Sequence, residues 1–322
     1  MSYTNAVLIT GGAQGLGYYA ALEIARKHPE YLVVVASRTD PNSSATTINS
    51  TLRQKNALFM PLDLGSFAKI RSFVNVWESK KYPPINHLLL NAGLQHPEGI
   101  KYTDDGLEAT FGVNQVGHAL LFHLLYPFMT DNARVVVVSS GTHDPAQKSG
   151  LPDAVYNTAE ELAHPKPGAE KTPGRQRYST SKLTNLLWTY ALNRRFSALS
   201  SEGKHLTVVA FDPGLMPGTG LARDASATLL FVWHHVLPRL IWLLKIMFHG
   251  NVHTPKESGE NLAWVAISAD VKEETGVYFE MRKTIPSSVD SHDEKKQHDL
   301  WDWTIKNVST SEEERQKFDI GK

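Results

Sequence analysis

Residues 6–17 read Ala6-Val7-Leu8-Ile9-Thr10-Gly11-Gly12-Ala13-Gln14-Gly15-Leu16-Gly17. The first four form a short apolar run, typical of a buried parallel strand, and a helical pattern follows the glycines as far as His28. A glycine-rich turn between a strand and a helix suits a dinucleotide phosphate, because the backbone can approach closely and the helix N-terminus offers free N–H groups. Glycine clusters also occur in simple tight turns. The predicted cofactor-binding residues here are Thr10, Gly11, Gln14, Gly15, Leu16 and Gly17.

The second apolar run, residues 31–36, predicts a second strand that ends at Ser37-Arg38. An acidic residue at this place would bind the ribose 2′-hydroxyl of NAD. An arginine and a hydroxyl instead suit a 2′-phosphate, so we predict NADP(H), bound through Ser37 and Arg38. NAD(H) stays open because Asp40 is close by, and Arg38 could be a solvated loop residue.

Three further predicted strands, residues 57–62, 86–90 and 134–138, alternate with helical patterns at 44–55, 70–78 and 106–125. This alternation predicts an α/β fold of the Rossmann type: one doubly wound parallel sheet with helices on both faces and ligands at the carboxyl ends of the strands. The residues at those ends join the predicted cofactor site, although the first of them could instead cap the next helix. They are Asp63, Leu64, Asn91, Ala92 and Gly93.

The stretch Tyr178-Ser179-Thr180-Ser181-Lys182 places a phenol and an ammonium on one helical face. Lowering the tyrosine pKa from near 10 to about 7 requires roughly 4 kcal/mol. One positive charge about 5 Å away supplies roughly 3 kcal/mol at an effective dielectric constant of about 20. We therefore expect Lys182 to lower the pKa of Tyr178, which would act as an acid and base. Most chance pairs with this spacing are merely a partly buried tyrosine beside a solvated lysine.

Composition excludes several classes of protein. The 322 residues contain 33 Lys+Arg and 33 Asp+Glu, so no global field favours nucleic acid. There is no cysteine, hence no disulfide or thiolate site. No metal site is predicted, because the adjacent pair His234-His235 diverges by about 100° on a helix. The N-terminus has no basic region before an apolar core, so we expect a cytoplasmic or membrane-associated protein that is not secreted.

Several motifs, in their order along the chain, resemble those of the short-chain dehydrogenase/reductase family. Thr10-Gly11-x-x-x-Gly15-x-Gly17 is similar to the family's cofactor motif, and Asn91-Ala92-Gly93 to its Asn-Ala-Gly element. The resemblance covers residues 5–280 and adds Pro213 and Gly214 to the expected cofactor site, after a sixth strand at 206–211. It also implies a catalytic tetrad, which consists of Asn114, Ser140, Tyr178 and Lys182.

The stretches at 138–143 and 213–221 are most similar to the branch that contains retinol dehydrogenases and protochlorophyllide reductases. The resemblance implies that Tyr178 protonates the forming alkoxide, that Lys182 also bonds the nicotinamide ribose, and that Ser140 bonds the substrate oxygen. Asn114 would hold a water for proton resupply. Two alternatives stay open: Ser139 could be the active hydroxyl, and Asn114 could merely kink its helix.

These features predict an NADPH-dependent oxidoreductase that acts on the carbonyl, or in reverse the alcohol, of a bulky apolar small molecule. Retinoid-like, steroid-like and secondary-metabolism carbonyls are all compatible. One alternative reaction is reduction of a carbon–carbon double bond, although the absence of cysteine argues against protochlorophyllide reduction. Another alternative is a nucleotide-sensing regulator without turnover. The sequence does not decide between a monomer and a homodimer.

One domain, 1–322, is expected, with three additions. An insertion at 141–177 is rich in proline and glycine, and either walls the substrate pocket or is a solvated excursion. The apolar segment 215–250 is interrupted by Pro238, Arg239 and Lys245, too often for a membrane span. It is interpreted as a substrate lid, a peripheral membrane contact through 229–248, or a subunit interface. Residues 286–322 are expected to pack on the core through Trp301 and Trp303.

Overall fold

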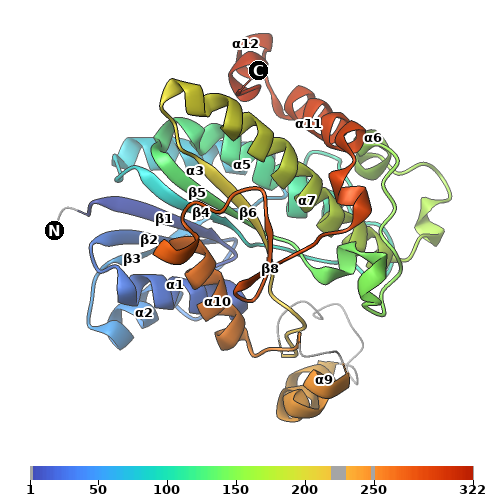
Figure 1. Ribbon diagram of the computed structural model, residues 1–322, viewed down its shortest axis with the longest axis horizontal. Coiled ribbons are helices and arrows are strands. Elements are labelled where there is room, and N and C mark those ends of the chain that lie inside the picture. The colour runs from blue at the N-terminus through green and yellow to red at the C-terminus, as the bar shows by residue number, and fades with distance from the viewer. Residues whose placement is uncertain (1–2, 219–229, 248–250, 322) are drawn as a thin grey trace.

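The computed structural model describes residues 3–218, 230–247 and 251–321. Within these residues one eight-stranded sheet has the order β3-β2-β1-β4-β5-β6-β7-β8 (Figure 1). Neighbouring strands pair in parallel except for the antiparallel pair β7 and β8. The strands are β1 (Asn5–Thr10), β2 (Tyr31–Ser37), β3 (Ala57–Pro61), β4 (Ile85–Leu90), β5 (Met129–Val138), β6 (Thr207–Asp212), β7 (Tyr278–Glu280) and β8 (Lys283–Ile285).

Helices cover both faces of the sheet, because alternate side chains of each strand point to opposite sides. In β1, Val7 and Ile9 are buried in one core cluster, while Ala6 and Leu8 are buried in the other. The first face carries α1 (Gly15–Lys27), α2 (Ser44–Leu52) and α10 (Pro255–Ile267); the second carries α3 (Phe67–Lys80), α5 (Gly117–Leu125) and α7 (Gly174–Leu199) (Figure 1). The predicted Rossmann-type, doubly wound α/β fold is confirmed.

Two details of the sheet and helices differ from the prediction. The short edge strand β8 was not predicted, because Lys283 and Thr284 are exposed polar residues with no apolar run around them. The helical pattern at 106–125 is interrupted: α4 (Ala109–Phe111) leads into a π-helical turn at Gly112–Val116 before α5 begins. Such turns are frequent at functional sites, and this one carries Asn114.

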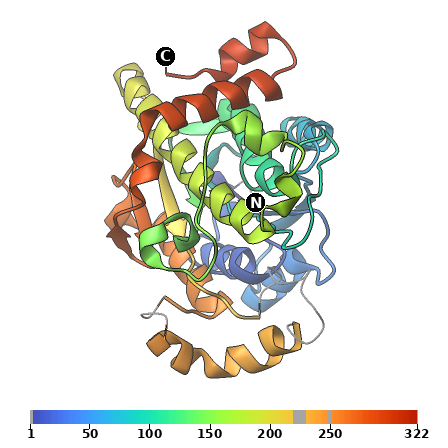
Figure 2. The ribbon, with the colours of Figure 1, turned by 90° about the vertical axis from the view of Figure 1, so that its right-hand side faces the viewer.

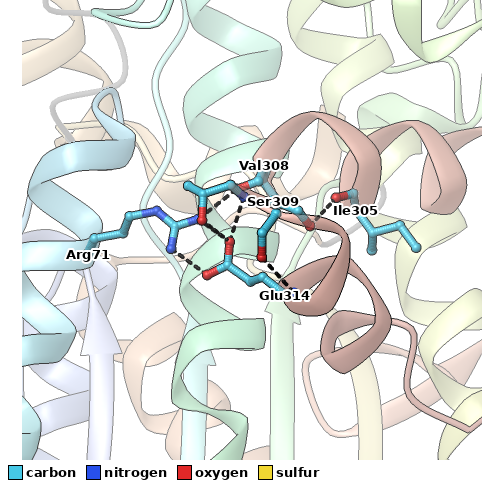
Figure 3. A network of polar contacts seen from close by, with 7 residues as sticks. Arg71, Ile305, Val308, Ser309 and Glu314 are labelled. Carbon is cyan, nitrogen blue, oxygen red and sulfur yellow. Dashed lines mark hydrogen bonds and ion pairs between the residues drawn. The ribbon is translucent and has the colours of Figure 1, made fainter.

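The C-terminal tail packs against the second helical layer. Helix α11 (Glu294–Val308) lies along α7 and buries Trp301, which is 1% exposed. Helix α12 (Glu312–Phe318) is attached by Arg71, whose guanidinium binds both oxygens of Glu314, at 2.6 and 2.8 Å, and the carbonyl of Val308 at 2.8 Å (Figure 3). Burial alone would raise the pKa of Glu314, but the hydrogen bonds from Arg71 and Thr310 outweigh it and hold this pKa at about 2.

The insertion is tied to the tail rather than solvated throughout. Its short helix α6 (Ala159–Ala163) lies beside α11, and Asp299 accepts hydrogen bonds from the hydroxyl of Tyr156 at 2.6 Å and from the amide of Ala159 at 2.8 Å. Trp303 donates to Glu160 at 2.7 Å and is only partly buried. These contacts join residues 141–177 and 286–322 into one covering layer over α7.

The apolar segment after β6 is described only in part, since residues 219–229 and 248–250 lie outside the described residues. Residues 230–247 form a helical bar that ends in α9 (Ile241–Met247) and lies along one edge of the molecule (Figure 2). Among the described residues, no helix combines the length and the apolar character that crossing a membrane would require.

Candidate active site

A cavity of about 330 Å³ lies at the carboxyl ends of the parallel strands. The structure brings every predicted cofactor-binding residue except Gly214 to its wall, including Tyr178 and Lys182. Asn114 and Ser140 are not among its lining residues. Ser139, the alternative active hydroxyl, also lines the cavity. Further lining residues, which the sequence did not single out, are Ala13, Ala36, Thr39, Pro41, Leu62, Leu94, Val113, Val138 and Met216. Most of them lie within two residues of a predicted position.

The backbone of the glycine loop forms part of the cavity wall, because Gly11, Gly15 and Gly17 have no side chains to cover it. A Cβ on Gly17 would lie 2.6 Å from both the Asn91 amide nitrogen and the Gly11 carbonyl, so only glycine fits. A Cβ on Gly15 would meet nothing within 4 Å. Helix α1 begins at this residue without a capping side chain and without an acidic residue in its first turn. Its free N–H groups therefore suit a pyrophosphate.

A chain of buried hydrogen bonds joins β1 to β4 and α5. The hydroxyl of Thr10 accepts the backbone N–H groups of Asn91 at 2.9 Å and Ala92 at 3.0 Å. Nδ1 of His118 lies 3.0 Å from the carbonyl of Asn114, which can only accept, so Nδ1 carries the proton. Nε2 of His118, 2.8 Å from the Thr10 hydroxyl oxygen, then accepts a hydrogen bond from that hydroxyl. Burial lowers the pKa of His118 to about 4, which keeps the ring neutral.

The far end of the cavity is lined by Arg38, which is exposed, and by Ser37. The Ser37 hydroxyl accepts the N–H of Ala13 at 3.2 Å and so supports the glycine loop. Asp40 already has a hydrogen-bond partner: its carboxylate accepts the backbone N–H of Ser44 at 2.8 Å, at the start of α2. The carboxylate of Asp63 likewise accepts the N–H of Gly65 at 3.1 Å and is paired with Lys69.

Tyr178 and Lys182 share the first turns of α7, and both are buried. The ammonium of Lys182 lies 5.5 Å from the centre of the Tyr178 ring and donates to the carbonyl of Val138 at 3.1 Å. The carbonyl is at the end of β5, so the lysine links α7 to the sheet at the cavity wall. The predicted proximity of phenol and ammonium therefore exists in the fold.

The expected lowering of the Tyr178 pKa was wrong for the protein without ligand. Burial raises the pKa of Tyr178 well above its usual value, and the negative charge of Asp212 raises it further. Burial also lowers the pKa of Lys182 to about 8, although Asp212 acts in the opposite direction. Both groups lose hydration in the interior, and this desolvation disfavours the phenolate as well as the ammonium.

The two serines at the end of β5 have different surroundings. The hydroxyl of Ser139 is buried and donates to the backbone carbonyl of Lys182 at 2.8 Å. Ser140 is half-buried, and its hydroxyl accepts the N–H of Thr142 at 3.3 Å. Among the described residues no acceptor is seen for the Ser140 proton. This geometry favours Ser140 over Ser139 as the group available to a substrate.

The side chain of Asn114 is fully engaged by neighbouring groups. Its oxygen accepts the N–H of Leu94 at 2.8 Å, and its nitrogen donates to the Leu94 carbonyl and to the hydroxyl of Ser181, both at 2.9 Å. Asn114 therefore fastens the loop after β4 to α7 from within a π-helical turn. Its predicted role in holding a water stays a prediction.

Asp212 is a buried residue of the site that the sequence did not identify as functional. Its carboxylate accepts the N–H of Gly141, next to Ser140, at 3.0 Å, and the N–H of Gly214 at 2.9 Å. Gly141 lies 71 residues away in the chain, so no local pattern indicated this contact. The insertion was expected either to wall the substrate pocket or to be a solvated excursion. It does not line this cavity but contributes, with Glu108 and Phe111, to a separate one of about 200 Å³.

Comparisons with known proteins agree with this architecture. Residues 5–158 match the family model for short chain dehydrogenase, and residues 221–316 match the AcuH dehydrogenase domain. A crystal structure of an uncharacterized protein from Mycobacterium paratuberculosis superposes with a TM-score of 0.66 at 25% identity, covering 95% of this chain and 94% of that one. The fold is therefore shared over nearly the whole length of both proteins.

Three relatives extend the likeness to sequence. The chain is 30% identical to polyprenol dehydrogenase from Homo sapiens, over 91% of this chain and 82% of the relative. It is 30% identical to retinol dehydrogenase 14 from Mus musculus, over 94% and 85%. It is 28% identical to protochlorophyllide reductase A from Oryza sativa subsp. japonica, over 94% and 80%. The chain therefore belongs to the short-chain dehydrogenase/reductase family of oxidoreductases, in the branch of the retinol dehydrogenases and protochlorophyllide reductases.

Proposed function

We propose that this oxidoreductase uses NADPH to reduce the carbonyl group of a bulky apolar small molecule, or oxidises the corresponding alcohol in reverse. The observation that carries the proposal is a single cavity that holds the glycine loop and Arg38 together with Tyr178 and Lys182. A dinucleotide that lay along this wall would extend from an arginine to an acid–base pair. A protein that only senses the nucleotide would not need Tyr178 and Lys182.

The residues present fit NADPH better than NADH. The uncapped start of α1 and the open space beside Gly15 would receive the pyrophosphate. Arg38 and Ser37 would bind the 2′-phosphate. Asp40, the group that would favour NAD, is already occupied at the start of α2 by Ser44. Asn91, Gly93 and Pro213 line the end of the cavity nearest Lys182, where a nicotinamide would lie.

The cofactor, when bound, supplies the hydride for the carbonyl carbon. Tyr178 then donates its proton to the substrate oxygen, and the raised pKa means that this proton is present at neutral pH. The hydroxyl of Ser140 donates a hydrogen bond to the same oxygen as negative charge develops. Lys182 places a positive charge beside Tyr178 and stabilises the phenolate that forms. In the alcohol direction the same groups act in reverse.

The apolar character of the substrate is supported by two observations. Leu94, Val113 and Met216 give apolar side chains to the wall of the cavity that holds Tyr178 and Lys182. Two of the relatives are dehydrogenases named for polyprenol and retinol, both of which are long apolar alcohols. An apolar wall lowers the free energy of a hydrocarbon substrate by removing its surface from water.

Replacement of Tyr178 by phenylalanine tests the chemistry. With a panel of apolar aldehydes, ketones and enones, we expect kcat for NADPH oxidation to fall by at least about 10²-fold, the usual contribution of a general acid. NADPH affinity, measured by fluorescence titration, should change little, because the ring remains. Tyr190→Phe, on the same helix but outside the cavity, is the matched control. Turnover by Tyr178→Phe at the wild-type rate would contradict the mechanism, and NADPH binding without turnover on any substrate would favour the sensor.

Replacement of Arg38 by alanine tests the cofactor preference. Loss of a charge-assisted hydrogen bond to the 2′-phosphate is worth about 1.5–3 kcal/mol, so the Kd for NADPH should rise roughly 10- to 100-fold. The Kd for NADH should stay the same, since NADH lacks that phosphate. Lys80→Ala removes one exposed cation far from the cavity and serves as the control. An equal loss for both cofactors would show that Arg38 does not read the 2′-phosphate.

We also propose that residues 230–247 contact a membrane surface. This bar carries apolar side chains on its inner and its outer side: Leu244 is 8% exposed, while Trp242 and Ile246 are 64% and 72% exposed. A helix that is apolar on its outer face is normally covered. Residues 225–256 contain no acidic residue, and Arg239 is exposed on the bar. Aromatic and aliphatic side chains interleaved with cations suit an anionic lipid surface, from which a lipid-like substrate could enter.

Vesicle flotation tests this contact. The wild-type protein should float with phosphatidylcholine vesicles that contain phosphatidylserine, and a Trp242→Ser/Ile246→Ser variant should remain at the bottom of the gradient. Val76→Ser, which removes an exposed apolar side chain on α3, should float like the wild type. Absence of the wild-type protein from the lipid fraction would exclude the contact. A dimer that dissociates in the double variant would identify the bar as a subunit interface instead.

A further inference from the structure

We propose that Asp212 is a positioning residue of the active site, whose buried carboxylate holds the Ser140 loop and the Pro213-Gly214 loop together. This inference rests on the proposed function, because it assigns a task to a residue behind the proposed acid–base pair. It adds a group that lies outside the tetrad and that takes no part in proton transfer itself.

The geometry around the carboxylate is that of a clamp. One oxygen of Asp212 accepts the N–H of Gly214 at 2.9 Å. The other accepts the N–H of Gly141 at 3.0 Å and the side-chain amide of Asn251 at 3.0 Å. Gly141 follows Ser140, and Gly214 follows Pro213, so one side chain connects the loops that leave β5 and β6. Displacement of the carboxylate would release both loops.

The chain around the clamp leaves no room for a substitute arrangement. A Cβ on Gly141 would lie 3.1 Å from the Asp212 carboxylate and 2.2 Å from the side chain of Gln147. Gly214 has φ +73°, and a Cβ there would lie 2.3 Å from the side-chain oxygen of Asn251. The positive φ at Gly214 therefore favours glycine there, and the close contact at Gly141 leaves little space for a side chain. The amide of Asn251 also donates to Glu280 at 3.0 Å, which carries the network onto β7.

The charge of Asp212 acts on the acid–base pair. It opposes the loss of charge that burial imposes on Lys182, and it favours the protonated form of Tyr178. The other titratable groups that face it are Tyr278 and Glu280 on β7, His143 and His253. His143 is neutral, because its Nε2 accepts the N–H of Ser288 at 3.1 Å and burial lowers its pKa.

Burial and Asp212 both raise the pKa of Glu280. Burial lowers the pKa of His253, and the positive charge of Lys245 lowers it further. Neither His143 nor His253 is therefore favoured as a cation in this interior. Lys182 is the facing group whose charged form the Asp212 carboxylate favours, against the effect of burial.

An asparagine at 212 separates this role from simple packing. Asparagine has the same shape, but it has one accepting oxygen and a donor in place of the other. Asp212→Asn therefore removes the charge and points a donor at one of the two loop N–H groups. Asp212→Glu keeps the charge and changes its position. Glu280→Gln neutralises the second carboxyl that Asn251 contacts, but it leaves both loop N–H groups bound.

The direct test is an NMR titration of Lys182 in protein with isotope-labelled lysine, with the signal assigned through Lys182→Arg. The midpoint should fall by about one pH unit or more in Asp212→Asn, because an opposing charge has been removed. It should stay at the wild-type position in Asp212→Glu and in Glu280→Gln. An unchanged midpoint in Asp212→Asn, or the same fall in Asp212→Glu, would show that the charge of Asp212 does not act on Lys182. This readout needs neither turnover nor cofactor, so failure of the proposed reaction would not be confused with failure of this role.

Kinetics test the clamp. On any substrate that wild-type enzyme reduces, Asp212→Asn should lower kcat about 10- to 100-fold, and the alkaline limb of its pH profile should move to lower pH. Asp212→Glu should lower kcat while its alkaline limb stays in place, which keeps the test valid if Asp212→Asn does not show a cooperative thermal unfolding transition. Wild-type kcat in both variants would overturn the clamp.

Discussion

The cavity depends on the buried hydroxyl of Thr10, which holds β1 against β4 at the point where the order of the strands reverses. A parallel sheet opens at such a switch point, and the open backbone groups there need partners. Thr10 accepts hydrogen bonds from the N–H groups of Asn91 and Ala92, and its hydroxyl donates one to Nε2 of His118. His118 in turn binds the carbonyl of Asn114 in the π-helical turn. One small side chain therefore connects the glycine loop, the Asn-Ala-Gly element and the helix that carries Asn114.

The proposed acid–base pair, Tyr178 and Lys182, also lines this cavity, and desolvation is the main influence on both groups. Burial favours neutral Tyr178 and neutral Lys182, so the protein needs compensating groups to keep a charged lysine beside the phenol. The carbonyl of Val138 and the carboxylate of Asp212 supply them from the ends of β5 and β6. Ser140 and Pro213 follow the same two strand ends. One edge of the sheet therefore positions both the hydroxyl proposed to bind the substrate and the groups that favour a charged Lys182.

Sequence predicted the parts of this arrangement that are local. The apolar run 31–36 lies within β2, and the glycine pattern indicated the loop that the cavity exposes. The sequence analysis did not predict β8, because this strand has only three residues and two of them, Lys283 and Thr284, are polar. The wrong sign for the Tyr178 pKa has a similar origin: Lys182 is visible one turn away, whereas burial and the charge of Asp212 arise only from the tertiary fold. Asp212 was missed because Gly141 and Asn251 meet it across long stretches of chain.

Isotope transfer tests most directly whether hydride passes to a carbonyl carbon beside Tyr178. The enzyme would be supplied with NADPH deuterated at C4 of the nicotinamide and with an apolar enone, which offers both a carbonyl and a carbon–carbon double bond. We predict one deuterium on the carbinol carbon of an allylic alcohol, located by NMR and mass spectrometry. Deuterium on the carbon β to an intact carbonyl would contradict the account and identify a double-bond reductase.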